Sequence, residues 1–142
     1  MKIIHGLDAI GKYLNIAIPA ELHAVEKVYP VRANTCYLDL IDRQNPFNDP
    51  VWKQCMPHPD ELHDYDASFD PLAEELQTVA PRLIRRFHDR AVLLTTNRCP
   101  MYCRFCFRKR QWRSGEIESD ITDAELDAVV DYYHAHPEVS EI

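Results

Sequence analysis

Three of the five cysteines lie together in one short segment, Cys99-Pro100-Met101-Tyr102-Cys103-Arg104-Phe105-Cys106, with the spacing C-x3-C-x2-C. Thiolates are the ligands that iron–sulfur clusters prefer. Three thiolates on one loop can bind three irons of a cubane cluster and leave the fourth iron open, as a catalytic metal site requires. Such an iron can chelate the amino and carboxylate groups of a small molecule and pass it one electron. The spacing therefore predicts a [4Fe–4S] cluster on Cys99, Cys103 and Cys106.

A zinc site is the alternative chemistry for these thiols. Zinc needs a fourth ligand, and Cys36, Cys55 and His88 are candidates, although none has the paired spacing of a zinc ribbon. A zinc-stabilised binding module without enzymatic activity therefore stays open. Cys36 and Cys55 are expected to be small core hydrophobes. Because the cysteine count is odd and a cluster with an open iron is sensitive to oxygen, we expect a cytoplasmic protein rather than a secreted disulfide scaffold.

Basic residues concentrate around the same segment. Between Arg82 and Arg113 ten basic residues stand against one acidic residue, Asp89, although the whole chain has a net charge of −7. The acidic total argues against a nucleic-acid partner, whereas the basic window can bind small anions. A solvated basic face is the alternative for this window. No apolar run approaches the roughly eighteen residues of a membrane span, so no membrane partner is expected.

The N-terminal half has the pattern of short helices. Apolar residues recur at helical spacing, and Pro19 and Pro30 separate the first segments. Prolines interrupt the chain from residue 45 to 70, which predicts a wrapping segment of short turns with one helical turn in it. Helices are predicted for five stretches, at residues 8–15, 20–28, 35–41, 51–54 and 72–79.

The pattern changes in the last third of the chain. Residues 91–96 form an apolar, partly β-branched run, which predicts a buried strand, with a helical segment as the alternative. Thr122 and Glu125 form a capping-box sequence that begins a helix ended by Pro137, and residues 139–142 resemble the start of another strand. Strand, loop, helix and strand in this order predict the opening of a parallel α/β architecture. One βα unit cannot bury a parallel strand on both faces, so we expect a fragment of a longer protein.

A family resemblance rests on the cysteine segment and its surroundings. With Phe105 before its last cysteine, the segment resembles the radical S-adenosylmethionine (SAM) signature, C-x3-C-x-aromatic-C. From about residue 28 to the end, the chain resembles an N-terminal fragment of the lysine 2,3-aminomutase family of radical SAM enzymes. The segments that carry this resemblance are residues 29–32, 53–62, 70–75, 81–90, 93–98 and 107–110.

The resemblance implies a fold and a set of cofactors. The fold would be α/β, with an N-terminal helical region at 1–80 followed by the first βα unit of a partial (β/α) radical SAM barrel at 81–142. That barrel would be truncated, and the iron–sulfur loop would span 97–110. The cofactors would be a [4Fe–4S] cluster, S-adenosyl-L-methionine and pyridoxal 5′-phosphate (PLP). The reduced cluster would cleave SAM to a 5′-deoxyadenosyl radical that begins the amino migration.

The resemblance also assigns residues. Cys99, Cys103 and Cys106 would bind the cluster, and Phe105 would lie beside SAM. Arg86 and Arg90 would hold the PLP phosphate, and Arg108 would hold the substrate carboxylate, roles that suit the planar donor fork of arginine. A surface ion pair is the alternative for each arginine. Phe87 stands where the family often has tyrosine, and no binding role is assigned to it.

The implied function is a PLP-dependent amino acid 2,3-aminomutase, an isomerase that converts L-lysine to β-lysine. The lysine that binds PLP and the glycine-rich SAM segment of the family are expected after residue 142, so the fragment should be inactive alone. The implied partners are a small amino acid substrate and, at full length, further copies of the protein in a homo-oligomer. A related aminomutase that acts on glutamate, or on a lysine of a translation factor, is the alternative within the family.

Overall fold

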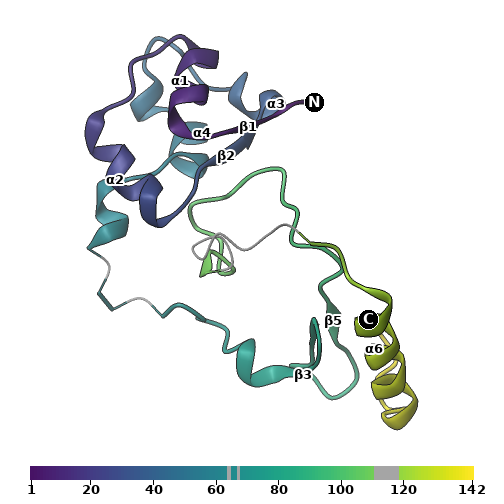
Figure 1. Ribbon diagram of the computed structural model, residues 1–142. Coiled ribbons are helices and arrows are strands. Elements are labelled where there is room, and N and C mark those ends of the chain that lie inside the picture. The colour runs from purple at the N-terminus through teal and green to yellow at the C-terminus, as the bar shows by residue number, and fades with distance from the viewer. Residues whose placement is uncertain (64, 67, 111–118) are drawn as a thin grey trace. The chain divides into compact units, whose positions relative to one another are not determined.

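The computed structural model describes residues 1–63, 65–66, 68–110 and 119–142 (Figure 1). The chain divides into two compact units. Unit 1 combines Met1–Phe69 with Cys99–Glu116, and unit 2 combines Asp70–Arg98 with Ile117–Ile142. The predicted boundary at residue 80 stays a prediction. Among the described residues, no helix is both long and apolar enough to cross a bilayer.

Unit 1 begins with a two-stranded antiparallel sheet and two helices. Strand β1 (Ile3–His5) pairs with β2 (Arg32–Asn34), and Ile4 lies opposite Ala33. Between the strands the chain forms α1 (Leu7–Leu14) and α2 (Ala20–Val28), which confirms the helices predicted at 8–15 and 20–28. These helices form because their apolar side chains recur on one face, and that face is buried in the unit.

The rest of the N-terminal segment consists of short helices that wrap around the same core. Helix α3 (Thr35–Leu38) covers only the first half of the helix predicted at 35–41, and α4 (Pro50–Cys55) confirms the helical turn predicted near 51–54. Asp49 caps α4 by accepting hydrogen bonds from the backbone N–H groups of Val51 and Trp52. Two 3-10 helices, η1 (Pro46–Asn48) and η2 (Pro59–Leu62), complete the segment. The core of unit 1 consists of Ile4, Leu7, Ile10, Leu14, Leu22, Val31, Ala33, Leu38, Ile41, Trp52, Cys55 and Met56.

Unit 2 contains a small antiparallel sheet in the order β3-β4-β5, formed by β3 (Thr78–Ala80), β4 (Leu83–Ile84) and β5 (Val92–Leu93). The predicted helix at 72–79 is wrong, because only the 3-10 helix η3 (Glu75–Gln77) forms before β3 begins. The predicted strand at 91–96 forms in part. Its β5 is antiparallel to β4, and Val92 is 51% exposed, so the expectation of a buried parallel strand is wrong.

Helix α6 (Asp123–Ala135) packs on this sheet and forms the second core with it (Figure 1). The capping box is present as predicted. Thr122 Oγ1 accepts from the backbone N–H of Glu125, and the Glu125 carboxylate accepts from the backbone N–H of Thr122. Beyond the helix, Glu141 makes an isolated parallel bridge with Arg90, which is the beginning of the pairing expected for residues 139–142.

The fold class is therefore mixed α/β. The residues described form two small open sheets, both antiparallel, and no closed barrel. The predicted parallel arrangement is present only as the single bridge to Glu141, since every named strand pairs in the antiparallel direction.

Candidate functional site

The three clustered cysteines lie on one turn-rich loop of unit 1. All three thiols are partly buried. The backbone N–H of Cys106 donates to the carbonyl of Cys103 at 3.0 Å, and the thiol of Cys99 donates to the carbonyl of Met101 at 2.8 Å. Burial raises the pKa of the Cys103 thiol, and negative charge on Cys99 and Cys106 raises it further. The three sulfur atoms are therefore electrostatic neighbours.

This donor set fits a cluster with three protein ligands. A bound metal lowers thiol pKa values and takes the thiolate form, so it would remove the mutual repulsion that raises the pKa of Cys103. In the described ranges, no group of three or more histidine, cysteine or acidic side chains is gathered closely enough to hold a metal ion. The structure thus gives the order, burial and neighbourhood of the thiols.

Backbone hydrogen bonds anchor the cysteine loop to the N-terminal segment. The N–H of Tyr102 donates to the carbonyl of Arg32 at 3.0 Å, and the N–H of Arg104 donates to the carbonyl of Gln54 at 2.9 Å. Nη1 of the Arg32 guanidinium donates a hydrogen bond to the carbonyl of Cys99 at 2.9 Å, and the guanidinium lies over the Tyr102 ring. Met101 packs against the core of the unit. The loop is therefore fixed at its beginning and in its middle.

A buried ion pair anchors the loop between its second and third cysteines. Arg104 forms two hydrogen bonds with the Glu61 carboxylate, from Nε at 3.1 Å and from Nη2 at 2.7 Å. The exposed fractions of the two side chains are 5% and 14%. Nη1 of Arg104 also donates to the carbonyls of Tyr29 and Pro30. One guanidinium therefore joins the loop to two earlier segments, and paired hydrogen bonds of this kind are among the strongest in proteins.

Lys109 adds a second positive charge to the same carboxylate. Its ammonium group contacts the Glu61 carboxylate and lies 4.1 Å from the centre of the Tyr29 ring. Burial alone would raise the pKa of Glu61, but the hydrogen bonds from Arg104 and Lys109 outweigh it, so the pKa is lowered. Glu61 therefore stays ionised between two cations that flank the last cysteine in sequence.

Phe105 and Arg108, the predicted SAM and substrate contacts, lie on the same loop. The Phe105 side chain is 72% exposed, which leaves its ring available to a ligand. Arg108 is partly buried and lies with its guanidinium carbon 4.8 Å from the centre of the Phe107 ring. The structure thus places Cys99, Cys103, Cys106, Phe105 and Arg108 in one unit.

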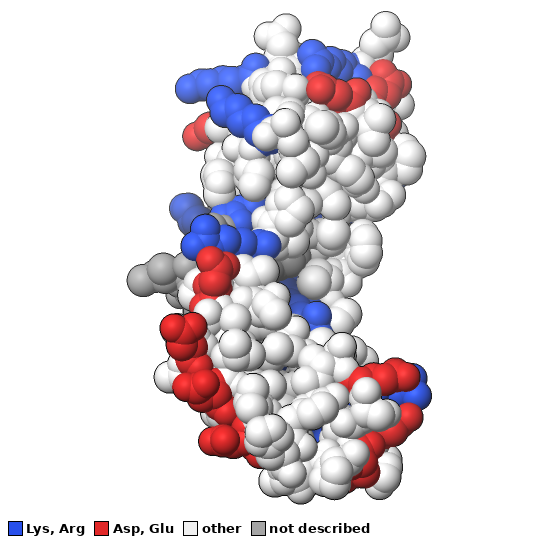
Figure 2. Space-filling model, turned by 90° about the vertical axis from the view of Figure 1, so that its right-hand side faces the viewer, with Lys and Arg blue, Asp and Glu red and all other residues white. Residues whose placement is uncertain are grey.

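Arg86 and Arg90, the predicted phosphate ligands, belong to unit 2. Arg86 is exposed, and no described residue hydrogen-bonds to its side chain. Arg90 is exposed too, but its guanidinium binds the Asp89 carboxylate through two hydrogen bonds, of 3.1 and 2.9 Å. A phosphate could thus meet Arg86 directly and would compete with Asp89 for Arg90. Figure 2 shows basic side chains beside acidic ones at several places on the face that it draws.

The two isolated cysteines differ from each other. Cys55 is fully buried in the core, as predicted, and burial raises the pKa of its thiol to about 12. Cys36 is exposed, so the prediction of a core position is wrong for this residue. It lies on the solvent side of α3, whereas Leu38 of that helix is the buried residue.

The sequence reasoning gave no role to Arg32, Glu61 or Arg104. A signal was present, because these residues lie in three separate segments that resemble the same family, at 29–32, 53–62 and within the cysteine loop. The structure brings these three segments together. A segment that resembles the family but contains no proposed ligand is therefore a candidate for anchoring the loop that carries the ligands.

Comparison with known proteins places the chain in a family, although no family model matches it. It is 41% identical to an L-lysine 2,3-aminomutase of Acetoanaerobium sticklandii, with 98% of this chain and 34% of that protein aligned. It is 34% identical to an L-lysine 2,3-aminomutase of Bacillus subtilis, with 97% of this chain and 29% of that protein aligned.

A glutamate 2,3-aminomutase of Clostridioides difficile is also similar, at 34% identity over 75% of this chain and 24% of that protein. The chain thus spans about a third or less of the length of these relatives. The similarity runs through the cysteine loop and both segments that anchor it, because nearly the whole chain is aligned with the lysine enzymes. Over the stretch that it spans, the chain belongs to the lysine 2,3-aminomutase family.

Proposed function

We propose that the whole protein is a radical SAM amino acid 2,3-aminomutase and that its substrate is L-lysine. One observation supports this most directly. Within a stretch that is 41% identical to a lysine 2,3-aminomutase, three thiols with the spacing C-x3-C-x2-C lie on a loop that is anchored by a buried ion pair. An anchored loop with three sulfur donors is what a cluster with one open iron requires. The complete barrel that would enclose such a site is part of the same proposal.

The residues of this chain would each contribute one function. Cys99, Cys103 and Cys106 would hold a [4Fe–4S] cluster, and Phe105 would lie beside SAM. When bound, the cluster, SAM and PLP supply the radical chemistry by which an amino group moves between neighbouring carbons. The residues of this chain bind and orient the reactants.

The arginines would bind the anionic groups. Arg108 follows the last cysteine by two positions and has the planar donor fork that suits a carboxylate, so it would hold the substrate carboxylate close to the cluster. Arg86 and Arg90 would hold the phosphate of PLP, and Arg90 would exchange part of its contact with Asp89 for the phosphate.

Anaerobic reconstitution with Fe²⁺ and sulfide tests the metal site. We expect a brown protein with about four irons per chain, as for a cubane cluster. Replacement of Cys99, Cys103 or Cys106 by alanine should abolish most of the iron binding. Cys36→Ala is the matched control, since Cys36 is exposed and lies outside the loop. A colourless protein that retains one zinc ion, or unchanged iron in the three loop variants, would overturn the proposal.

Product analysis of the whole protein tests the reaction. With SAM, PLP and a low-potential reductant, L-lysine should give β-lysine, and L-glutamate should give little or no product. Arg108→Gln should raise the KM for lysine by about 10- to 100-fold, the loss expected for a hydrogen-bonded carboxylate. Arg43→Gln is the control, because Arg43 is an exposed arginine paired with Asp39 and lies outside the loop. Turnover of glutamate in place of lysine would overturn the assignment of the substrate.

A further inference from the structure

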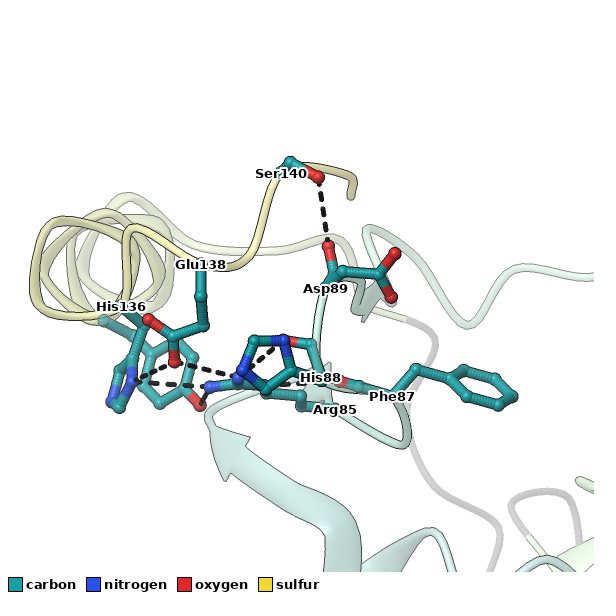
Figure 3. Close-up of polar contacts among 8 residues, drawn as sticks. Arg85, Phe87, His88, Asp89, His136, Glu138 and Ser140 are labelled. Carbon is teal, nitrogen blue, oxygen red and sulfur yellow. Dashed lines mark hydrogen bonds and ion pairs between the residues drawn. The ribbon is translucent and has the colours of Figure 1, made fainter.

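Arg85 and Arg86 are adjacent in the sequence but have opposite environments. The Arg86 side chain is exposed, whereas the Arg85 side chain is only 15% exposed and is surrounded by hydrogen-bond acceptors (Figure 3). Arg85 follows β4 directly and begins the connection to β5, which contains both arginines assigned to the phosphate. Its contacts therefore determine how that connection is held.

The Arg85 guanidinium donates to four acceptors within 3.4 Å and also contacts a ring nitrogen of His136. Two acceptors belong to the connection itself: Nη2 donates to the carbonyl of His88 at 2.6 Å, and Nε donates to the carbonyl of Phe87 at 3.4 Å. Through these bonds the side chain of Arg85, the first residue of the connection, holds the carbonyl groups of Phe87 and His88. The bonds therefore restrict the backbone between Arg86 and Arg90.

The other three contacts come from α6 and the segment after it. Nη1 donates to the Tyr132 hydroxyl at 2.9 Å and contacts Nδ1 of His136 at 3.3 Å. Nη2 donates to the Glu138 carboxylate at 2.9 Å. The Tyr132 and His136 rings stack, with their centres 4.1 Å apart, which fixes both acceptors. The guanidinium thus attaches the connection to the helix.

The far end of the same connection is held by backbone bonds. The carbonyl of Asp89 accepts from the N–H of Ser140 at 2.8 Å, and the N–H of Ala91 donates to the carbonyl of Glu141 at 3.0 Å. The Ser140 hydroxyl also donates to the carbonyl of Asp89, at 3.4 Å (Figure 3). Arg86 and Arg90 therefore lie between two fixed points, although their own side chains are exposed. Preorganised ligand groups bind more tightly because less conformational freedom is lost on binding.

We propose that Arg85 is a positioning residue, which fixes the backbone of residues 86–90 so that Arg86 and Arg90 meet one phosphate group together. This inference rests on the proposed function, in which these two arginines hold the phosphate of PLP. Arg85 itself does not contact the phosphate, since its donors are already occupied.

The test compares PLP with pyridoxal, which lacks the phosphate ester, in titrations of the whole protein followed by absorbance. The ratio of the two dissociation constants measures the contribution of the phosphate. Arg85→Gln should lower this ratio by roughly tenfold, because the two arginines would no longer be held together. Arg85→Lys should not restore it, because lysine keeps the charge but has three donors in place of five. Full restoration by lysine would overturn the inference, since charge alone would then suffice.

Control variants separate positioning from stability. Arg82→Gln removes an arginine of the same unit that binds Glu125 and Ser119, so it should lower the thermal midpoint and leave the ratio unchanged. If Arg85→Gln fails to fold, Tyr132→Phe and Glu138→Ala each remove one acceptor and should lower the ratio by about threefold. An unchanged ratio in both would overturn the inference.

Variants of the phosphate ligands distinguish this inference from the function on which it rests. Arg86→Gln and Arg90→Gln should each lower the ratio directly. If both leave it unchanged, the assignment of the phosphate site is wrong and the role of Arg85 is wrong with it. If both lower it and the Arg85 variants do not, only the positioning role is overturned.

Discussion

Arg104 and Arg43 each face a carboxylate in unit 1, but only the first pair is buried. The side chains of Arg104 and Glu61 are 5% and 14% exposed, whereas those of Arg43 and Asp39 are 51% and 52% exposed. Loss of one partner of a buried pair leaves an uncompensated charge away from water, while an exposed pair contributes little.

Arg104→Gln should therefore lower the free energy of unfolding by about 3 kcal/mol, the lower end of the range for a broken buried pair, because Lys109 still contacts Glu61. Urea unfolding followed by the fluorescence of Trp52, which is buried in this unit, measures the change. Arg43→Gln is the matched control and should cost less than about 0.5 kcal/mol. Equal losses in both variants would show that the buried pair has no special role.

The acid sensitivity of unit 2 depends on Glu138. Its pKa is lowered from 4.5 to about 2, first by its own backbone N–H and then by Arg85 and His136. The folded state therefore favours the ionised form, so this contribution to stability is complete above about pH 4.5 and disappears as the pH falls towards 2. Glu138→Gln should lower the thermal midpoint at pH 6 and have no effect near pH 2.

Thermal unfolding followed by circular dichroism between pH 6 and pH 2 measures this difference. Glu141→Gln, three positions further along the chain, is the control, because its carboxylate has only a 3.9 Å contact with Arg90. A difference between wild type and Glu138→Gln that persists at the lowest pH would contradict the assignment.

Short sequence patterns indicate candidate ligands of the site but not the residues that support it. The spacing of Cys99, Cys103 and Cys106 is local, so the sequence alone indicates their chemistry. Arg104 and Glu61 are 43 positions apart, and no periodicity connects residues at that distance. Arg85 and Arg86 are adjacent and chemically identical, and only the tertiary contacts of Arg85 separate their roles.

At the scale of elements, α6 owes its start to the capping box. Thr122 and Glu125 satisfy backbone N–H groups reciprocally, and Glu125 also accepts from Arg82. Thr122→Ala should lower the free energy of unfolding of unit 2 by about 1 kcal/mol. Asp127→Ala, at an exposed position inside the same helix, should leave stability unchanged or raise it slightly, because alanine is the better helix former.

Helical content measured by circular dichroism during urea unfolding distinguishes these two variants. If Thr122→Ala unfolds at the same urea concentration as the wild type, the capping contacts do not determine the start of the helix.

Elements with a clear local signal were predicted well, and short strands were not. The helices α1, α2 and α6 have apolar periodicity and caps or prolines at their ends, and all three form close to the predicted bounds. The strands β3, β4 and β5 are two or three residues long, too short for a repeating pattern to appear. Their antiparallel pairing depends on neighbours that periodicity does not specify, and for this reason a helix was predicted where η3 and β3 form.

At the scale of the whole molecule, the chain has two separate cores that share no residue. Leu38 and Leu40 test the first of them, since Leu38 is fully buried and Leu40 is 65% exposed. Leu38→Ala should lower the free energy of unfolding by about 2–5 kcal/mol, and Leu40→Ala should cost less than about 0.5 kcal/mol. Equal effects in urea unfolding would contradict the assignment of the core.

The division into units is the feature that sequence reasoning was least able to foresee. Local patterns describe consecutive residues, whereas unit 1 combines the first sixty-nine residues with the cysteine loop that begins at Cys99. The mixed α/β class was nevertheless predictable, because it depends on residue types at short spacing, whereas the cluster on the three cysteines stays a prediction.

The pairing of Glu61 with Arg104 also sets an order of events at the ribosome. Arg104 is translated 43 residues after Glu61, a delay of roughly 2–9 s at about 5–20 residues per second. Throughout this interval the nascent N-terminal helices have no cation from the loop to neutralise the acidic side chain. The first sixty-nine residues therefore lack this buried ion pair until the loop has been translated, so that the packing of this unit is completed late in the synthesis of the stretch.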